Sequence, residues 1–336
     1  MLVDGGLGSD LSKAAEGAKD QESLGFDGLW AAETNHDPFL ALTLAAEHTE
    51  RIQLGTGIAV AFARSPMTLA QTAYNLNAFA EGRLLLGLGS QIKAHITRRF
   101  SMPWSHPAAR MREFVLAMQA IWTAWEDGSK LDFRGDFYEH TLMTPFFDPG
   151  PNPYGAPRVF LAAVGELMTE VVGEVCDGML CHGFTTESYL REVTLPAVER
   201  GLAKGDRNRT DIELSLPSFI VTGSTEEEMA AAADGVRQQI AFYGSTPAYR
   251  GVLEHHGWGE LQTELNALSK QGRWVDMGTL IDDEMLAAFA VVAEPDAVAA
   301  GLLGRFGDVV DRISFYTPYK AEPGLFASTV DQLRAG

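Results

Sequence analysis

The chain is short of the residues that several common classes of protein require. It has two cysteines in 336 residues, Cys176 and Cys181, which excludes a disulfide framework and favours a reducing compartment. We expect both to be small, buried packing residues. No apolar run reaches the roughly 18 residues that a membrane-spanning helix needs. The chain begins with a strand-like segment rather than a basic and apolar leader, so the expected location is cytoplasmic.

Basic residues are also scarce. The 26 lysines and arginines face 45 acidic residues, a net charge of −19, which argues against binding to nucleic acid or to an anionic membrane. One anionic ligand is still allowed, because backbone amides at a helix N-terminus can hold a phosphate. The sequence motifs for a serine nucleophile and for a metal site are missing. There is no Gly-x-Ser-x-Gly elbow, and the adjacent His255 and His256 would face different directions on a helix, so no metal site is expected.

Short apolar runs alternate with amphipathic stretches along the whole chain. Helix start signals follow several of the runs: Ser9 as an N-cap, then Asp37 and Ser65, each directly before a proline. The pattern predicts eight strands, at residues 2–7, 28–33, 51–60, 84–88, 158–163, 178–181, 212–221 and 312–316.

Eight buried strands, each followed by a helix, predict an α/β fold: a single (β/α)8 TIM barrel over residues 1–336. The rival is an open doubly wound sheet, but residues 87–92 lack the third glycine of a dinucleotide fingerprint. Three insertions interrupt the regular alternation of strand and helix. They lie at about 95–107, at 127–157 with a hairpin near 131–140, and at 244–293. Because loops after the strands build the active site of a barrel, the first and third can wall a pocket. The hairpin can do so too or lie elsewhere.

Four segments, in order and each beside a strand, carry a family resemblance. They are residues 24–30, 49–56, 82–89 and 176–178, and together they resemble the luciferase-like superfamily over nearly the whole chain. Two further segments, 101–107 and 241–246, resemble its branch of actinobacterial F420-dependent oxidoreductases. The resemblance implies coenzyme F420 as the cofactor, with FMN as the alternative.

The third strand contains an unusual Gly-Thr-Gly-Ile sequence at residues 55–58. Glycines weaken a strand interior and often mark a bulge or a close approach of backbones. Similar proteins have a non-proline cis peptide here that presses against the cofactor ring, and the resemblance places it between Gly57 and Ile58. The other interpretation is that the glycines only relieve crowding inside the barrel.

The resemblance also implies the remaining contacts to the cofactor. The loop after strand four should line it, and its phosphate should lie between the loops after strands five and six, where a helix N-terminus is an anion site. This chain departs from many relatives by having Val164 in place of a glycine and no basic residue near Phe184, and Glu166 is an unfavourable neighbour for phosphate. The implied contact residues are Gly89, Ser90 and Gln91, then Ala163, Val164 and Gly165, then His182, Gly183 and Phe184.

Two histidines are the candidate catalytic residues. His36 follows strand two, where related deazaflavin enzymes have an acid and a histidine near the reacting face; Asn35 replaces the acid and is a candidate cofactor contact. A histidine can exchange a proton near neutral pH, although His36 could instead bond a loop carbonyl. Ile92 stands where some relatives have a catalytic glutamate, and His95 is the possible substitute, unless it is an ordinary surface residue.

The leading hypothesis is hydride transfer between F420 and a small organic substrate. One alternative is an FMN-dependent monooxygenase of the same family. The other is a non-catalytic flavin- or deazaflavin-binding protein, because the acids expected at Asn35 and Ile92 are missing. The family implies a homodimer, and the sequence does not identify the substrate.

Overall fold

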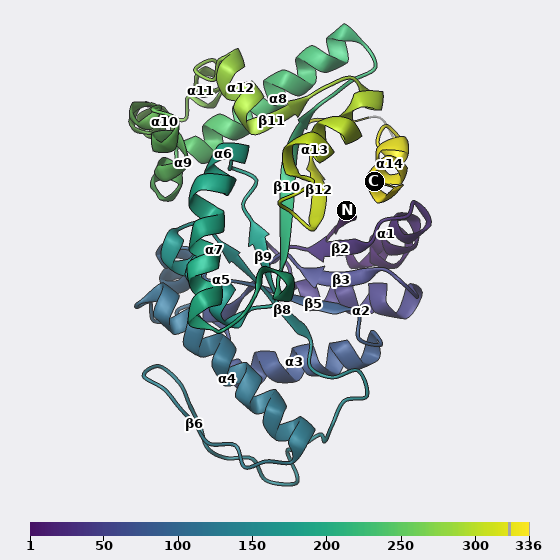
Figure 1. The fold of residues 1–336 in the computed structure, drawn as a ribbon, viewed down its shortest axis with the longest axis vertical. Helices are drawn as coiled ribbons and strands as arrows, with labels where there is room; N and C mark the ends of the chain where they lie inside the picture. The colour runs from purple at the N-terminus through teal and green to yellow at the C-terminus, as the bar shows by residue number, and fades with distance from the viewer. Residues whose placement is uncertain (322–323, 336) are drawn as a thin grey trace. The chain divides into compact units, whose positions relative to one another are not determined.

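The computed structural model describes residues 1–321 and 324–335. Its strand order is that of a closed barrel of eight parallel strands with helices between them, so the predicted (β/α)8 barrel is confirmed and the open sheet is excluded. The barrel strands, which Figure 1 labels where there is room, are β1 (Leu2–Leu7), β2 (Gly28–Ala31), β3 (Gln53–Thr56) continued by β4 (Ala59–Val60), β5 (Leu84–Gly89), β8 (Arg158–Ala163), β9 (Gly178–Cys181), β10 (Glu213–Val221) and β12 (Arg312–Tyr316).

Helices connect these strands. The longer ones are α1 (Leu11–Ser23), α2 (Pro38–His48), α3 (Pro66–Phe79), α4 (Pro107–Asp127), α5 (Glu166–Val175), α7 (Leu195–Lys204), α8 (Glu226–Gly244), α10 (Gly259–Lys270), α13 (Val298–Phe306) and α14 (Ala327–Ala335). The short ones are η1 (Ala61–Ala63), η2 (His95–Arg99), α6 (Glu187–Tyr189), η3 (Leu190–Thr194), η4 (Arg209–Asp211), η5 (Pro247–Tyr249), α9 (Arg250–His255), α11 (Trp274–Gly278), α12 (Asp283–Phe289) and η6 (Pro295–Ala297).

The chain divides into two compact units. The larger unit comprises Gly5–Leu180 and Ala197–Glu213. The smaller unit comprises Met1–Asp4, Cys181–Pro196 and Leu214–Gly336.

The larger unit is built on neighbouring parallel strands in the order β2, β3, β5 and β8. All six residues of β5 are buried, as expected for a strand covered on both faces. β3 and β5 approach closely at Gly87, where an added Cβ would lie 1.8 Å from the carbonyl oxygen of Thr56. The Thr56 hydroxyl in turn donates to the Gly87 carbonyl at 2.7 Å, which ties the two strands together.

The smaller unit contains the parallel strands β11 (Ala290–Val292), β10, β12 and the start of β1. Arg312 on β12 makes two hydrogen bonds, of 2.7 and 2.8 Å, with the Asp4 carboxylate on β1, and both side chains are fully buried. A hydrophobic core around α8 extends to Phe184, Phe219 and Phe289.

Several local expectations need correction. The N-cap of α1 is Asp10, whose carboxylate accepts from the Ser12 amide, and not Ser9. The expected loop after strand four begins with the π-helical turn η2. The insertion after strand seven is largely helical, as expected, but β11 and the following α13 were not predicted. The apolar and polar residues of these two short elements fit several periods, so pattern alone could not assign them.

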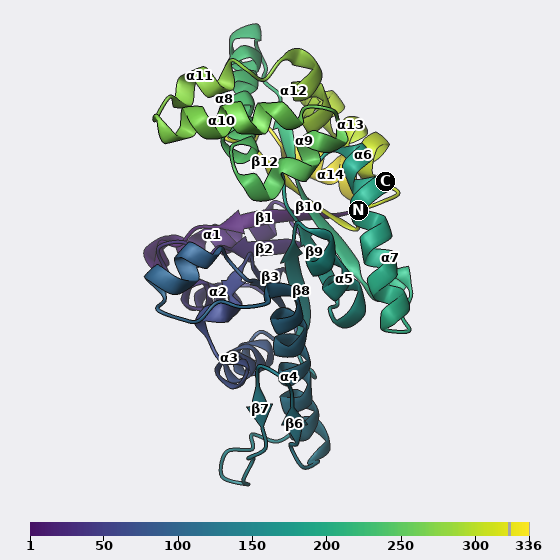
Figure 2. The ribbon, with the colours of Figure 1, turned by 90° about the vertical axis from the view of Figure 1, so that its left-hand side faces the viewer.

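The predicted hairpin near 131–140 is present as β6 (Phe133–Arg134) and β7 (Glu139–His140). It lies beside α4 (Figure 2), where the Glu113 carboxylate accepts from the backbone amides of Asp136, Phe137 and Tyr138. The hairpin is therefore anchored to a helix. Of the helices described, none is both long and apolar enough to cross a membrane.

Candidate functional site

The third barrel strand is interrupted at the predicted position. The peptide bond between Gly57 and Ile58 is cis, which confirms that expectation and separates β3 from β4. Backbone hydrogen bonds hold both sides of the break to the end of β2: the Gly57 amide donates to the Ala31 carbonyl at 2.8 Å, and the Glu33 amide donates to the Ile58 carbonyl at 3.2 Å. After the break, β4 pairs with β5.

Glycines around the break are required by close packing. A Cβ on Gly55 would lie 2.3 Å from the Trp30 ring, and a Cβ on Gly89 would lie 2.7 Å from the Ile58 side chain. Gly57 and Ile58 are nonetheless only half-buried, although the flanking residues Thr56 and Ala59 are fully buried. The glycines thus relieve crowding, as the second interpretation held, and the same packing leaves a partly exposed apolar surface at Ile58.

Glu33 holds this region together, although its sequence context predicts no such role. Its carboxylate accepts from the Val60 amide at 2.7 Å and from the Arg64 guanidinium at 2.6 Å. Arg64 also binds the Asp37 carboxylate at 2.8 Å. The Glu33 side chain is only 8% exposed, so its charge is compensated mainly by the Val60 amide and the Arg64 guanidinium rather than by water. Nothing in the local sequence pairs Glu33 with Arg64, because the two are far apart along the chain.

His36 lies in the exposed loop between β2 and α2. No hydrogen bond to its ring occurs within residues 1–321 and 324–335, so the structure gives no support to a role in bonding a loop carbonyl. Asn35 is also exposed, and its side-chain oxygen accepts from the Thr34 hydroxyl at 3.0 Å. The His36 imidazole is therefore available to a ligand or to water.

The loop after β5 is tied to the same neighbourhood. Gln91 has a positive φ of 57°, and its side-chain oxygen lies 3.1 Å from Nδ1 of the exposed His95. The Arg99 guanidinium donates to the Thr34 carbonyl in the loop after β2. The structure thus links the loops that carry His36 and His95, while Gly89 is buried and Ser90 is half-buried beside them.

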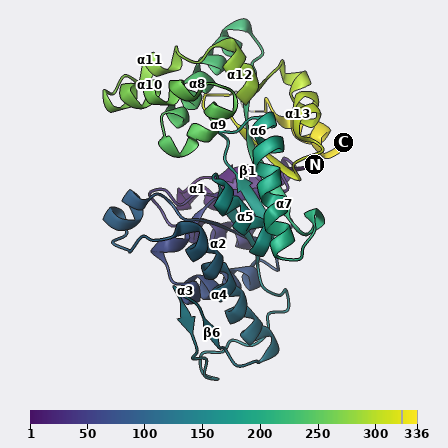
Figure 3. The same ribbon diagram turned by 60° about the vertical axis from the view of Figure 1, so that its left-hand side comes forward.

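The loop after β8 leads into the N-terminus of α5. Gly165 is its N-cap, and an added Cβ there would meet no atom within 4 Å. The next amides, those of Glu166 and Leu167, have no partner inside the helix because they belong to its first turn. The Glu166 carboxylate binds the Arg200 guanidinium of α7 at 2.6 Å, and Figure 3 shows α5 and α7 side by side. Arg200 also bonds the Glu170 carboxylate at 2.9 Å, so the charge of Glu166 is compensated only in part.

The loop after β9 belongs to the smaller unit and fits a phosphate site less well. The Phe184 side chain is buried in the core and stacks on Phe289, with ring centroids 4.6 Å apart. The Phe184 amide donates to Nδ1 of His182 at 3.0 Å, so it is already used. Burial lowers the pKa of His182 to about 4, which leaves the ring neutral at neutral pH. His182 and Gly183 stay predictions as cofactor contacts. The side chain and the amide of Phe184 are both engaged within the protein and are not available to a cofactor.

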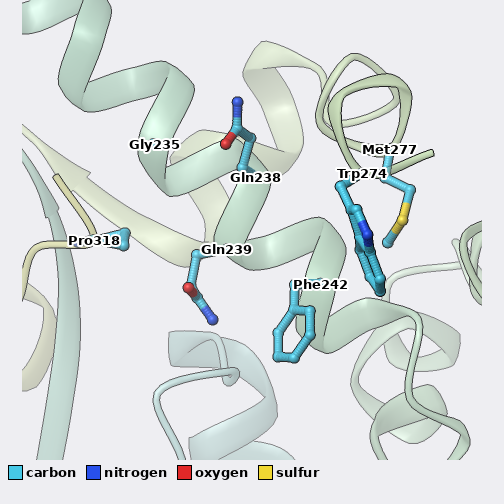
Figure 4. Close-up of a pocket in the computed structure, with 7 residues that line it drawn as sticks. All are labelled: Gly235, Gln238, Gln239, Phe242, Trp274, Met277 and Pro318. Carbon is cyan, nitrogen blue, oxygen red and sulfur yellow. The ribbon is translucent and has the colours of Figure 1, made fainter. Parts of the chain in front are cut away.

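A separate hollow of about 280 Å³ opens beside α8 in the smaller unit. Figure 4 shows Pro318 and Gln239 on one side of it and the rings of Phe242 and Trp274 on the other. It includes none of the predicted site residues.

A family model described as luciferase-like monooxygenase matches residues 2–312. The chain belongs to this family. An uncharacterized protein of Mycobacterium tuberculosis is 58% identical over 313 residues, which cover 93% of this chain and 92% of the relative. The F420-dependent glucose-6-phosphate dehydrogenase of Intrasporangium calvum is 29% identical over 271 residues, which cover 76% of this chain and 78% of the relative.

The solved structure of the coenzyme F420-dependent tetrahydromethanopterin reductase from Methanopyrus kandleri has the same fold. The two structures superpose with a TM-score of 0.77 at 20% identity, over 98% of this chain and 96% of that chain. Similarity at this level of identity supports the barrel alone.

The larger unit has the groups that a flavin or deazaflavin of this luciferase-like family would need. Ile58 offers a half-buried apolar surface for a planar ring, and Ser90 and Gln91 offer polar groups at the end of β5. Free first-turn amides of α5 can bind a phosphate. The residues present therefore fit such a cofactor.

Both cysteines are buried thiols that form no disulfide among the described residues, as predicted, and burial raises the pKa of the Cys176 thiol. The paired histidines of the insertion bond hydroxyl groups: His255 Nε2 lies 3.1 Å from the Ser188 hydroxyl, and His256 Nε2 lies 2.7 Å from the Thr186 hydroxyl. These contacts are a sufficient explanation for the pair.

Proposed function

We propose that this protein is an F420-dependent oxidoreductase that transfers a hydride between the deazaflavin and a small organic substrate. The observation that carries the proposal is the half-buried apolar surface of Ile58 where β3 is interrupted, between the fully buried residues Thr56 and Ala59. The choice of F420 is supported by the F420-dependent relative from Intrasporangium calvum. A small-molecule substrate, a homodimer and a cytoplasmic location remain predictions.

In this proposal, F420 supplies the two-electron hydride chemistry when bound, and the protein supplies orientation, shielding and proton exchange. Ile58 would support the ring with its apolar side chain. Ser90 and Gln91 would supply hydrogen-bonding groups to it. His36, which is exposed and makes no hydrogen bond among the described residues, would give or take a proton at its imidazole ring during hydride transfer.

The anionic tail of the cofactor is assigned to the loop from Ala163 to Gly165. The first-turn amides of α5 would donate to the phosphate, and Arg200, which bonds the Glu166 carboxylate, would reduce the repulsion between that carboxylate and the phosphate. This arrangement needs no net positive charge on the protein, which is consistent with a chain of net charge −19.

Cofactor titrations test the proposal. The purified protein is titrated with F420 and, separately, with FMN, and quenching of the ligand's fluorescence is followed. We expect saturable binding of F420 and much weaker binding of FMN. Tight binding of FMN without binding of F420 would replace the proposal by an FMN-dependent monooxygenase, the alternative that the family description supports.

A matched pair of variants connects the titration to the break in β3. Replacing Ile58 by Ala removes most of the apolar surface and should weaken F420 binding about 5- to 30-fold, which corresponds to roughly 1–2 kcal/mol of lost contact. Leu40→Ala on the exposed face of α2, where Leu40 is 58% exposed, is the control and should bind F420 as the wild type does. Equal affinities for the three proteins would remove Ile58 from the site.

A non-catalytic binding protein is the second candidate, favoured by Asn35 and Ile92 at positions where acids were expected. A panel of alcohols, aldehydes, enones and sugar phosphates, offered to the F420-loaded protein, separates the two. Oxidation or reduction of the bound deazaflavin by any member supports the enzyme. Tight F420 binding without turnover of any member supports the binding protein.

A further inference from the structure

A cluster of one histidine and three tyrosines lies at the carboxyl ends of two barrel strands in the smaller unit. His182 directly follows β9, and Tyr316 is the last residue of β12. Tyr243 is in the last turn of α8, and Tyr249 ends η5. A Cβ on Gly183 would lie 2.9 Å from the Tyr316 ring, so this ring packs directly on the loop after β9. Barrel enzymes bind their substrates at this end of the strands.

The rings fix one another's positions. His182 stacks on Tyr249 with centroids 4.5 Å apart and meets the edge of Tyr243 at 4.6 Å. Tyr316 stacks on the buried Phe219 at 4.6 Å. All four members of the cluster are half-buried, so they are held in place and still reach the surface.

Hydrogen bonds determine which groups are free to bind a ligand. Nδ1 of His182 accepts from the Phe184 amide, so the ring proton is assigned to Nε2, which lies 3.2 Å from the Tyr249 hydroxyl oxygen and donates to it. The Tyr249 hydroxyl hydrogen then has no acceptor among the described residues. The hydroxyls of Tyr243 and Tyr316 lie 2.6 Å apart, and one donates to the other. The hydroxyl hydrogen of the accepting tyrosine is not used in this hydrogen bond.

The cluster carries no charge at neutral pH. Burial lowers the pKa of His182 to about 4 and raises the pKa of the Tyr249 and Tyr316 phenols. The neighbouring cation, Arg250, is bound to the Glu254 carboxylate at 2.6 Å. Within the described part of the chain, no lysine, arginine or acidic side chain forms a hydrogen bond or ion pair with any of the four rings. The cluster is thus a neutral surface that offers hydrogen-bond donors.

We infer that Tyr249, oriented by His182, donates a hydrogen bond to the oxygen of an uncharged carbonyl- or hydroxyl-bearing substrate, with the Tyr243–Tyr316 pair as a second donor. This inference rests on the proposed function and adds the class of substrate. An anionic substrate such as a sugar phosphate would require a cation that the cluster does not provide. The aromatic rings around the donors favour a compact apolar skeleton.

Calorimetric titration of the F420-loaded protein tests the inference, with cyclohexanone and cyclohexanol as neutral probes and glucose 6-phosphate as the anionic one. We expect both neutral probes to bind more tightly than glucose 6-phosphate. Tyr249→Phe keeps the ring and removes the donor, so cyclohexanone should bind about 3- to 10-fold more weakly, as expected for one lost hydrogen bond. Tyr154→Phe, an exposed tyrosine of the other unit, is the matched control and should bind as the wild type does.

His182→Asn tests the positioning role, because the Asn side-chain oxygen can still accept from the Phe184 amide while the donor to Tyr249 is lost. We expect this variant to weaken cyclohexanone binding by a smaller factor than Tyr249→Phe. The double variant should then bind no more weakly than Tyr249→Phe alone, since His182 acts only through Tyr249. Additive losses would assign His182 an independent role and contradict the inference.

F420 affinity, measured on every protein in the same series, separates the two claims. A wild-type protein that fails to bind F420 refutes the proposed function. If F420 binds normally to the wild type and to Tyr249→Phe, three further outcomes each overturn the inference alone: no binding of either neutral probe, tighter binding of glucose 6-phosphate, or unchanged cyclohexanone affinity in Tyr249→Phe.

Discussion

Two histidines of this protein occupy opposite environments, and each environment determines what the ring can do. His36 is exposed and makes no hydrogen bond within the described residues, so its ring can exchange protons with a ligand and with water. His182 is confined between Tyr243 and Tyr249 and accepts a backbone hydrogen bond at Nδ1. It is suited to orienting another group rather than to carrying protons.

Replacing His36 by Ala should separate chemistry from cofactor binding. We expect turnover of any substrate identified by the panel to fall by about 100-fold or more, the usual contribution of a general acid or base, while F420 affinity changes less than about 3-fold. The measurement is steady-state turnover beside an F420 titration. His95→Ala is the comparison, because His95 is the other candidate. Wild-type turnover in His36→Ala would remove His36 from the mechanism.

The buried His182 should also make stability depend on pH. Burial lowers its pKa to about 4, below the value of about 6.5 for an unfolded chain. Below pH 6.5 the unfolded state therefore binds a proton that the folded state does not, so this contribution is complete above pH 6.5 and is lost as the pH falls toward 4. Between pH 7 and pH 5 the loss is about 2 kcal/mol.

Urea unfolding at the two pH values measures that loss. The difference between the free energies of unfolding at pH 7 and pH 5 should be about 2 kcal/mol smaller in His182→Asn than in the wild type. His95→Asn, which removes an exposed histidine, should keep the wild-type difference. Equal pH dependence in all three proteins would show that His182 is not held neutral.

At the scale of elements, the break between β3 and β4 depends on a carboxylate from the end of β2. Glu33→Gln keeps the shape of the side chain and an oxygen that can accept from Val60 and Arg64, but it removes the charge that faces Arg64. We expect the free energy of unfolding to fall by about 1–3 kcal/mol and F420 affinity to fall with it, because Val60 and the Ile58 surface move. Urea unfolding and fluorescence titration measure the two effects.

Glu139→Gln is the control for that change, since Glu139 pairs with Arg134 on the surface and both side chains are more than half exposed. An exposed ion pair contributes little, so stability and F420 affinity should both stay near the wild-type values. If Glu33→Gln behaves like Glu139→Gln, the carboxylate does not hold the break in place.

The sequence predicts regular elements of this protein far better than its irregular ones. The bounds of β1, β8, β9 and β12 agree with the prediction residue for residue, and β8 and β9 are largely apolar runs between clear breaks. β11 and α13 escaped prediction, since both lie in or after a long insertion that breaks the strand–helix repeat. Ser9 and Asp10 are both residue types that cap helices, and the N-cap of α1 is Asp10 rather than the predicted Ser9.

The residues of the site also divide into those that the sequence predicts and those that it does not. The cis peptide at Gly57–Ile58 followed from a family resemblance and is confirmed. Contacts between distant residues could not be read from the sequence: Glu33 with Arg64, and His182 with Tyr249, have no local signal. Phe184 was assigned to the cofactor from its position after strand six, but core packing with Phe289 uses its side chain.

At the scale of the whole molecule, the first and last barrel strands are joined by the buried pair of Asp4 and Arg312. Asp4→Asn leaves the Arg312 charge without its counter-charge in a fully buried position. We expect the free energy of unfolding to fall by about 3–5 kcal/mol, measured by urea unfolding. Replacing both partners by apolar residues, Asp4→Leu with Arg312→Met, should cost less than Asp4→Asn alone. A larger loss in the double variant would contradict this account.

A crystal structure of the F420 complex is the decisive experiment. We expect the deazaflavin ring to contact Ile58 at the break in the third strand, and the phosphate to lie within hydrogen-bond distance of the first-turn amides of α5. A ring bound elsewhere, for example in the hollow between Phe242 and Pro318, or a third strand that makes no contact with the cofactor, would contradict it.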